Sequence, residues 1–132
     1  MTKCPKRQIP SQESISDLET STNLIFYREA AEIKEMTDLL KQKIMTEGKP
    51  FFDVWMYEAS DNIQNLAMAF GERICLESAL NKLALAKDPQ LKSVLTKIIR
   101  LHAISLVKEN MPFYLTNQII NAKAAKALEV DF

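Results

Sequence analysis

The chain has 132 residues, of which 47% are hydrophobic and 26% are charged, a composition suited to one folded domain and unlike that of a disordered protein. Its 17 Lys and Arg residues balance 17 Asp and Glu residues, which argues against a nucleic-acid binder or a membrane-surface binder, because both need an excess of positive charge. Two Gly and five Pro are too few turn residues for a β-sandwich or a barrel, and no apolar run is long enough to span a bilayer.

Residues 1–20 are polar and carry both early prolines, so we expect a disordered tail followed by a helical domain over residues 21–132. The first helix is expected to start at "STN", residues 21–23, which offers three possible N-caps. Apolar residues then recur at helical spacing and form one face: Ile33, Met36, Leu40 and Ile44. The helix is predicted to end at "GKP", residues 48–50, where Gly serves as the C-cap and Pro cannot continue the helix.

A long second helix is predicted over about residues 51–87. Its main apolar stripe is formed by Ala59, Ile63, Leu66, Phe70 and Ile74. Three leucines extend this stripe to one side near the C-terminal end: Leu76, Leu80 and Leu83. A face this broad is expected to pack against more than one partner.

The sequence "KDP" separates the second helix from a third, with Asp88 as the N-cap and Pro89 at the first helical position. This third helix is predicted to end or kink at "NMP", residues 110–112. A short fourth helix is expected from Thr116 or Asn117 to about Glu129. No segment alternates like a half-buried strand, and the connections are short. We therefore predict an all-α fold, an antiparallel bundle of about four helices.

The residues that most often carry chemistry are sparse. The single histidine, His102, lies on the apolar face of the third helix, where a core or boundary position is the expected role. Cys4 and Cys75 are far apart in sequence and are interpreted as free thiols. One histidine and two distant cysteines do not supply the ligands of a zinc site, so we expect no metal. No catalytic residue is assigned.

Two aromatic stretches allow either a core or a cofactor pocket. They are "PFFDVWMY" at residues 50–57 and "MPFYL" at residues 111–115. Spacing rules do not separate the two interpretations, and the composition favours the core.

The stretch "AFGERICLE", residues 69–77, places charges among apolar residues. Helical projection puts Arg73 and Glu77 in the middle of the apolar stripe and Glu72 towards its edge. Arg73 and Glu77 are four residues apart, the spacing of an ion pair along a helix, and burial would require such a pair. They are the candidate buried ion pair, which would either fix helix register or meet another domain, subunit or ligand. Gly71 within the helix would be accommodated by the close approach of a neighbour.

The ordered set of motifs resembles the C-terminal helical region of acyl-CoA oxidases, especially the branched-chain and acyl-CoA-oxidase-like members. The resemblance covers about residues 24–130. Its marker residues are Phe70, Gly71, Glu72 and Arg73, followed by Asp88 and Pro89 at the start of "DPQLKSVL". The chain departs from the family at Pro112, at His102 and at its final sequence "ALEVDF", which lacks a peroxisomal tripeptide.

This resemblance implies a piece of a larger flavin enzyme that oxidises acyl-CoA to trans-2-enoyl-CoA and makes hydrogen peroxide in fatty-acid β-oxidation. FAD would belong to the full-length enzyme, and no cofactor is assigned to this chain alone. The implied partners are a second copy or the missing domains of the enzyme, and the implied location is the peroxisome, or otherwise the cytoplasm.

Two functions remain open at this point. The first is a structural, dimer-contacting part of an acyl-CoA oxidase, inactive by itself. The second is a stand-alone helical interaction module whose broad apolar face binds a partner helix.

Overall fold

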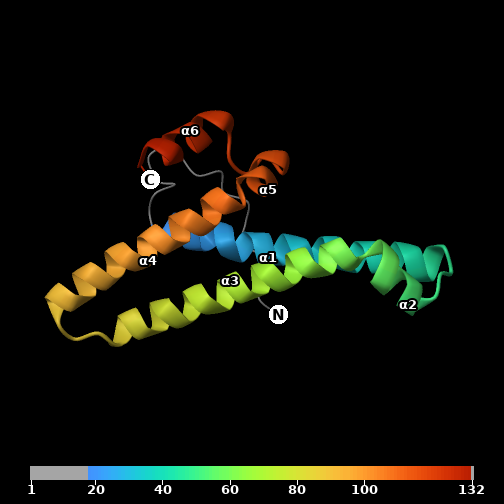
Figure 1. Cartoon of the computed structure of the whole chain (residues 1–132), viewed down its shortest axis with the longest axis horizontal. Helices are drawn as coiled ribbons and strands as arrows, with labels where there is room; N and C mark the ends of the chain where they lie inside the picture. Colours follow the sequence, from blue (N-terminus) through green and yellow to red (C-terminus); the bar gives the residue numbers. More distant parts are fainter. Residues whose placement is uncertain (1–17, 132) are drawn as a thin grey trace.

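The structure, a computed structural model, describes residues 18–131. The disordered tail was predicted over residues 1–20. Residues 1–17, including Cys4, lie outside the described residues, and the prediction is wrong for residues 18–20, which belong to the first helix. Residues 18–131 contain helices and connections and no strand, so the prediction of an all-α fold is confirmed (Figure 1).

The first helix, α1 (Leu18–Leu40), continues into a π-helical segment, η1 (Lys41–Thr46). It begins before the predicted N-caps at residues 21–23, which lie inside the helix. The Thr22 hydroxyl donates to the Leu18 carbonyl over 2.6 Å, so it bonds back along the helix instead of capping it. The predicted stop is confirmed: Gly48 adopts a φ of 66°, in the left-handed region where glycine has no steric penalty.

The long second helix that the sequence predicted is broken near its start. A turn of helix, α2 (Phe51–Asp53), leads into a π-helical segment, η2 (Val54–Glu58), and α3 (Ser60–Leu85) follows. At the break, the Ala59 amide donates to the Val54 carbonyl over 2.8 Å, one residue further back than in an α-helix. Val54 and Ala59 are fully buried against Met36, and this packing fixes the break.

The third predicted helix is confirmed as α4 (Pro89–Glu109). Its N-cap is Asp88, whose carboxylate accepts a hydrogen bond from the Gln90 amide over 3.0 Å, and Pro89 occupies the first helical turn. The fourth predicted helix is wrong in its bounds. The chain instead forms α5 (Met111–Thr116) directly after α4, then a connection, then α6 (Ala122–Asp131).

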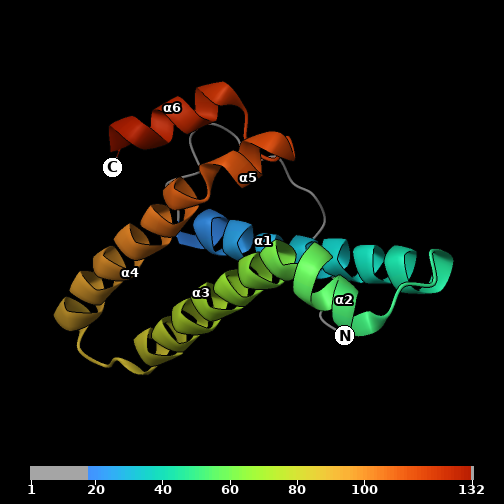
Figure 2. The ribbon, with the colours of Figure 1, turned by 45° about the vertical axis from the view of Figure 1, so that its right-hand side comes forward.

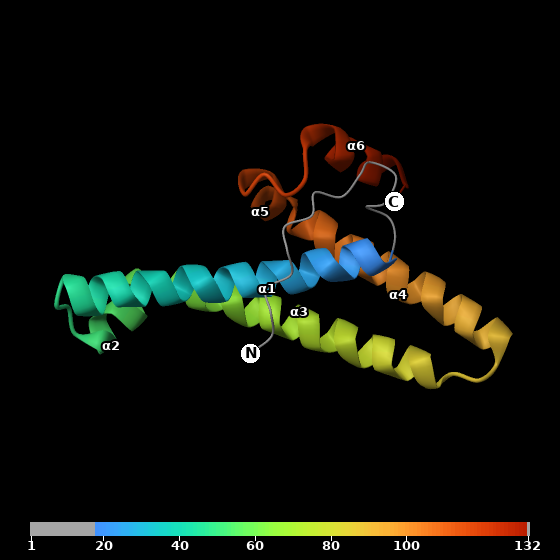
Figure 3. The same cartoon turned by 180° about the vertical axis from the view of Figure 1, so that it is seen from behind.

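Helix α1 lies alongside α3, and the two run antiparallel, with α2 at the far end of the pair (Figures 1 and 2). Helix α4 turns back from the end of α3 and crosses the N-terminal half of α1. Helices α5 and α6 fold over this crossing, as the view from behind also shows (Figure 3). The molecule is therefore a long helical hairpin with a second layer of helices at one end.

The core is divided between the two ends of the hairpin. The larger cluster joins α1, α3, α4, α5 and α6, and its largest fully buried side chains are Tyr114, Leu76, Leu128 and Val107. The smaller cluster is built around Met36, Val54 and Ala59.

A stripe of four apolar side chains on α4 is exposed. Leu91, Val94, Ile98 and Leu101 are between 52% and 57% exposed, although they repeat at helical spacing. We call these four residues the α4 stripe. The described residues leave it uncovered.

The prediction that both aromatic stretches belong to the core is half wrong. Tyr114 is buried and Phe113 packs against the larger cluster, but Phe51, Phe52 and Tyr57 are exposed at the tip of the hairpin. The π-helical break turns this segment away from the line of α3, which accounts for the exposure.

Candidate functional site

The most buried ion pair in the described residues joins α1 to α3. The guanidinium of Arg28 donates to the carboxylate of Glu72 over 2.6 Å, and the two side chains are only 7% and 13% exposed. The amide of Asn110, at the end of α4, donates to the same carboxylate over 3.3 Å. Glu72 on α3 thus links α3 to α1 and to the end of α4.

Arg73 forms a second, more open cluster one helical position away. Its Nε atom contacts Glu29 of α1 over 2.5 Å, and its Nη1 atom contacts Glu77 over 2.6 Å. The pairing of Arg73 with Glu77 at a spacing of four residues matches the expected geometry. The expected burial of this pair is wrong, because the Glu77 side chain is 48% exposed.

The roles that the helical projection gave to Glu72 and Glu77 are therefore exchanged. The buried face of α3 runs through Ala69, Leu76 and Leu83, and Phe70 lies outside it at 49% exposure, with the Arg73 guanidinium over its ring at 5.2 Å. Glu72 borders this face, so it is the buried partner.

Arg28 and Glu29 were missed from the sequence, although a signal existed. Arg28 and Glu32 fall at four-residue steps between Leu24 and Met36, all four of which are buried on α1. Charged residues at core spacing indicate buried ion pairs, and the apolar positions alone did not reveal them.

The charges in this cluster are suited to holding helices. Hydrogen bonds from Arg73 to Glu29 and then to Glu77 raise the pKa of its guanidinium above the usual range, so it stays charged. Glu72 accepts two hydrogen bonds from neighbouring elements. The arrangement fixes the position of α3 against α1 and α4, and none of its members is placed as a free acid or base.

Glu32 differs from its neighbours in being buried without a hydrogen bond or ion pair in the described part of the chain. Burial, with the negative charge of Glu35 as a second cause, raises the pKa of its carboxyl above the ordinary value, against the opposing effect of Arg28. A negative charge on Glu32 therefore lowers the stability of the folded chain.

Three other residues singled out from the sequence, Gly71, Cys75 and His102, belong to neither of these ion-pair clusters. A Cβ atom added to Gly71 would meet nothing within 4 Å, so the expected close approach of a neighbour is wrong. Cys75 is an exposed free thiol. His102 is exposed on α4 and takes no core position. Of the remaining family markers, Asp88 and Pro89 act in helix capping.

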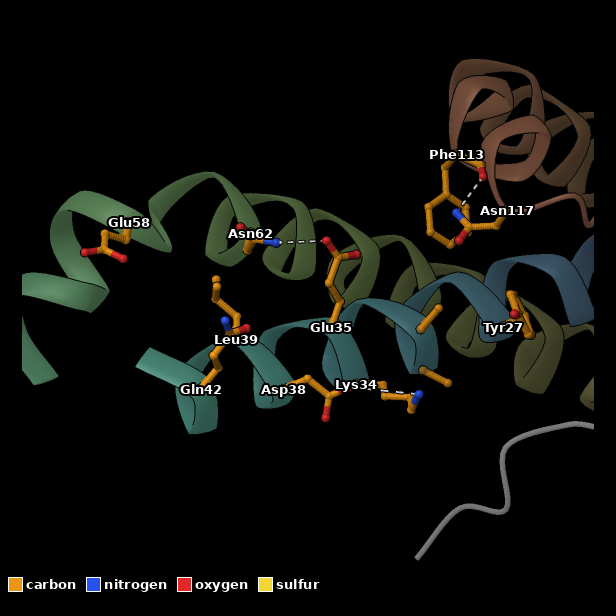
Figure 4. Close-up of a pocket in the computed structure, with 12 residues that line it drawn as sticks. Tyr27, Lys34, Glu35, Asp38, Leu39, Gln42, Glu58, Asn62, Phe113 and Asn117 are labelled. Atoms are coloured by element: carbon orange, nitrogen blue, oxygen red, sulfur yellow. Dashed lines mark hydrogen bonds and ion pairs between the residues drawn. The ribbon is translucent and has the colours of Figure 1, made fainter. Parts of the chain in front are cut away.

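A groove of about 620 Å³ follows one side of α1 (Figure 4). Its floor is formed by α1 residues, its walls by the start of α3 with η2 and by α5. The lining residues are Tyr27, Ala30, Ala31, Lys34, Glu35, Asp38, Leu39, Gln42, Glu58, Asn62, Phe113 and Asn117. Carboxylates outnumber ammonium groups in this lining by three to one.

Residues 18–131 hold no group of three or more side chains able to bind a metal ion. Within the same residues, no helix combines the length and the apolar character needed to cross a membrane.

A family model described as acyl-CoA oxidase matches residues 17–131. Comparisons with curated proteins and with solved structures found no match. The family match spans every described helix, from the start of α1 at Leu18 to the end of α6 at Asp131.

Proposed function

Because the chain belongs to the acyl-CoA oxidase family, we propose that it serves as part of the C-terminal helical region of such an enzyme. In this proposal it contributes packing and subunit contacts and carries no catalytic group. The observation that supports this role most strongly is the uncovered α4 stripe, whose apolar residues repeat at the spacing of a packed helix face.

The family implies the reaction of the complete enzyme. An acyl-CoA loses two hydrogens from its α and β carbons to FAD, which gives a trans-2-enoyl-CoA. Oxygen then takes the two electrons and two protons from the reduced flavin and becomes hydrogen peroxide. We propose that the complete enzyme works in peroxisomal fatty-acid β-oxidation.

The described residues that line the groove do not fit FAD. A flavin dinucleotide needs a binding site for its diphosphate, commonly backbone amides of a glycine-rich turn or basic side chains. The described groove offers Glu35, Asp38 and Glu58 against the single ammonium of Lys34, so it would repel a diphosphate. Neither Gly48 nor Gly71 lines it. We therefore assign FAD to other parts of the enzyme.

The α4 stripe is proposed to pack against a second copy or another domain of the enzyme. Exposed apolar surface is removed from water by such contact, at about 25 cal/mol per Å². In the isolated chain, the same surface favours self-association.

Sedimentation velocity tests the contact role. We expect the wild-type chain to show a larger average mass as concentration rises, and V94K/I98K to remain monomeric. The matched control is N81K/S93K, which adds the same charge at two exposed polar positions and is expected to associate like the wild type. A wild-type chain that stays monomeric at high concentration would contradict the contact role.

The surrounding genomic sequence separates this proposal from a stand-alone interaction module. An adjoining open frame that codes for a β-barrel domain and a glycine-rich helix supports the oxidase. A promoter and stop codons directly at both ends of this frame would overturn it in favour of the module.

A further inference from the structure

The groove along α1 has the form of a binding surface for an extended segment. Its lining residues on α1 and η1 run from Tyr27 to Gln42, a length of about 22 Å at the rise of an α-helix. Ala30 and Ala31 give it a low floor, with no long side chain to fill the space above them.

The walls of the groove stand at opposite ends. Glu58 and Asn62 border it near the tip of the hairpin, and Phe113 and Asn117 border it near the second layer of helices (Figure 4). A bound segment would therefore contact α5 at one end and the start of α3 at the other.

The middle of the groove carries more negative than positive charge, with Glu35 and Asp38 against Lys34. Within residues 18–131, the hydrogen bond that Glu35 accepts comes from the neutral amide of Asn62, over 3.3 Å. Asp38 is 3.9 Å from the ammonium of Lys34, and both of these side chains are mostly exposed, so the pairing is weak. Glu58, by contrast, already pairs with Lys43 and Lys49. A cationic segment is the complementary ligand at Glu35 and Asp38.

We propose that the basic segment near the N-terminus of the same chain docks in this groove, with Lys3, Lys6 and Arg7 facing Glu35 and Asp38. Residues 1–10 contain these three cations and no acidic residue, and the first acid in the sequence is Glu13. Charge thus distinguishes this segment from the mixed surface of the described helices.

The connection to α1 is long enough for this contact. Glu35 lies 17 residues into the chain after Leu18, a distance of about 26 Å along the helix. The 11 residues from Arg7 to Leu18 span up to about 36 Å when extended. Because the segment is tethered, its effective concentration at the groove is high, which favours this occupant over a free peptide of the same charge.

Cys4 allows a direct test, because it lies within the proposed segment. In a C75S chain, Cys4 is the only cysteine and can carry a nitroxide spin label. The label is expected to broaden the amide signals of Ala30, Lys34, Glu35 and Asp38 in the nitrogen-15 spectrum. Signals from the exposed face of α4, around Ser93, are expected to keep their intensity.

Two variants show whether charge holds the segment. K3E/K6E/R7E is expected to abolish the broadening at Glu35 and Asp38, and so is 0.5 M salt, estimated to shorten the screening length to about 4 Å. The matched control is K97E/K123E/K126E, which makes the same charge change at three exposed positions outside the groove and is expected to keep the broadening.

A mixed sample distinguishes the same chain from a second copy. Spin-labelled chain without nitrogen-15 is combined with nitrogen-15 chain that carries no spin label. The proposal predicts no broadening of the groove signals in this mixture. It is overturned if the groove signals broaden only in the mixture, if they do not broaden in the labelled chain, or if the broadening survives K3E/K6E/R7E.

Discussion

Arg28 on α1 and Glu72 on α3 form a nearly buried ion pair, 44 residues apart in sequence, with 2.6 Å between the guanidinium nitrogen and the carboxylate oxygen. Glu72 also accepts a hydrogen bond from Asn110. The pair therefore sets the position of the two longest helices relative to each other and to the end of α4. Its main effect is on the arrangement of the helices, since a buried ion pair adds little to the free energy of folding compared with apolar residues of the same volume.

Removal of one partner of this pair should be strongly destabilising. We expect E72A to lower the free energy of unfolding by about 3 kcal/mol, because it leaves the charge of Arg28 buried without a carboxylate. The double variant R28M/E72L should recover most of this loss, because neither member of the ion pair is then left buried without the other. Urea denaturation monitored by circular dichroism measures both values.

The exposed pair provides the control. We expect E77A to lower the free energy of unfolding by less than about 1 kcal/mol, because Glu77 is half exposed and Arg73 keeps its contact with Glu29. Equal losses from E72A and E77A would contradict the assignment of Glu72 as the buried partner.

Replacement of Gly71 should stabilise the chain. Gly71 lies inside α3, and an added Cβ atom has open space around it. We expect G71A to raise the free energy of unfolding by about 0.5 to 1 kcal/mol, because alanine loses less backbone entropy in a helix. Thermal unfolding of the two proteins measures the change, and a lower midpoint for G71A would show that a neighbour does approach the helix here.

Glu32 should make stability depend on pH. Its pKa is raised in the folded chain, chiefly by burial, so the folded state binds the proton more tightly than the unfolded state does. Its contribution to stability is therefore present below the unfolded pKa and is lost as pH rises through the folded pKa.

The variant E32Q isolates this contribution. We expect E32Q to be more stable than the wild type at pH 7, and the advantage to shrink as pH falls towards 4, where Glu32 is protonated in the folded chain. Urea denaturation across this range gives the difference. An advantage that is constant with pH would show that the carboxyl does not titrate in a buried setting.

Tyr114 should be needed for the larger core cluster. Its hydroxyl donates to the Leu24 carbonyl over 3.0 Å within the core, and its burial raises the pKa of the phenol well above the usual range. We expect Y114F to lower the free energy of unfolding by about 0.5 to 1.5 kcal/mol, because one buried hydrogen bond is lost while the Leu24 carbonyl, which lies inside α1, keeps its bond within the helix. Urea denaturation measures this loss, and an unchanged midpoint would place water at the carbonyl instead.

Local signals in the sequence predicted two helix ends correctly. Asp88 and Pro89 begin α4, and Gly48 ends the first helical segment, because capping and left-handed φ values depend on one or two residues. The break at Ala59 was not predictable in this way. It depends on the burial of Val54 and Ala59 against Met36, a contact between distant parts of the chain.

The buried face of α3 shows a second limit. Phe70 and Ile74 are larger and more apolar than Ala69, so the sequence pattern placed them in the core stripe. In the structure, Ala69, Leu76 and Leu83 face α1 and α4, seven residues apart, because a repeat near 3.5 residues keeps the same face towards a neighbouring helix. Contacts with the partner helices determine which face of α3 is buried. That face in turn determines that Glu72, and not Glu77, is the buried glutamate.

We propose that this member of the acyl-CoA oxidase family is a structural part and carries no chemistry alone. An assay of the purified chain with FAD and an acyl-CoA tests this most directly. We predict that no flavin absorbance is retained after gel filtration and that peroxide production equals that of a protein-free control. Retained flavin together with acyl-CoA-dependent peroxide production would contradict the claim.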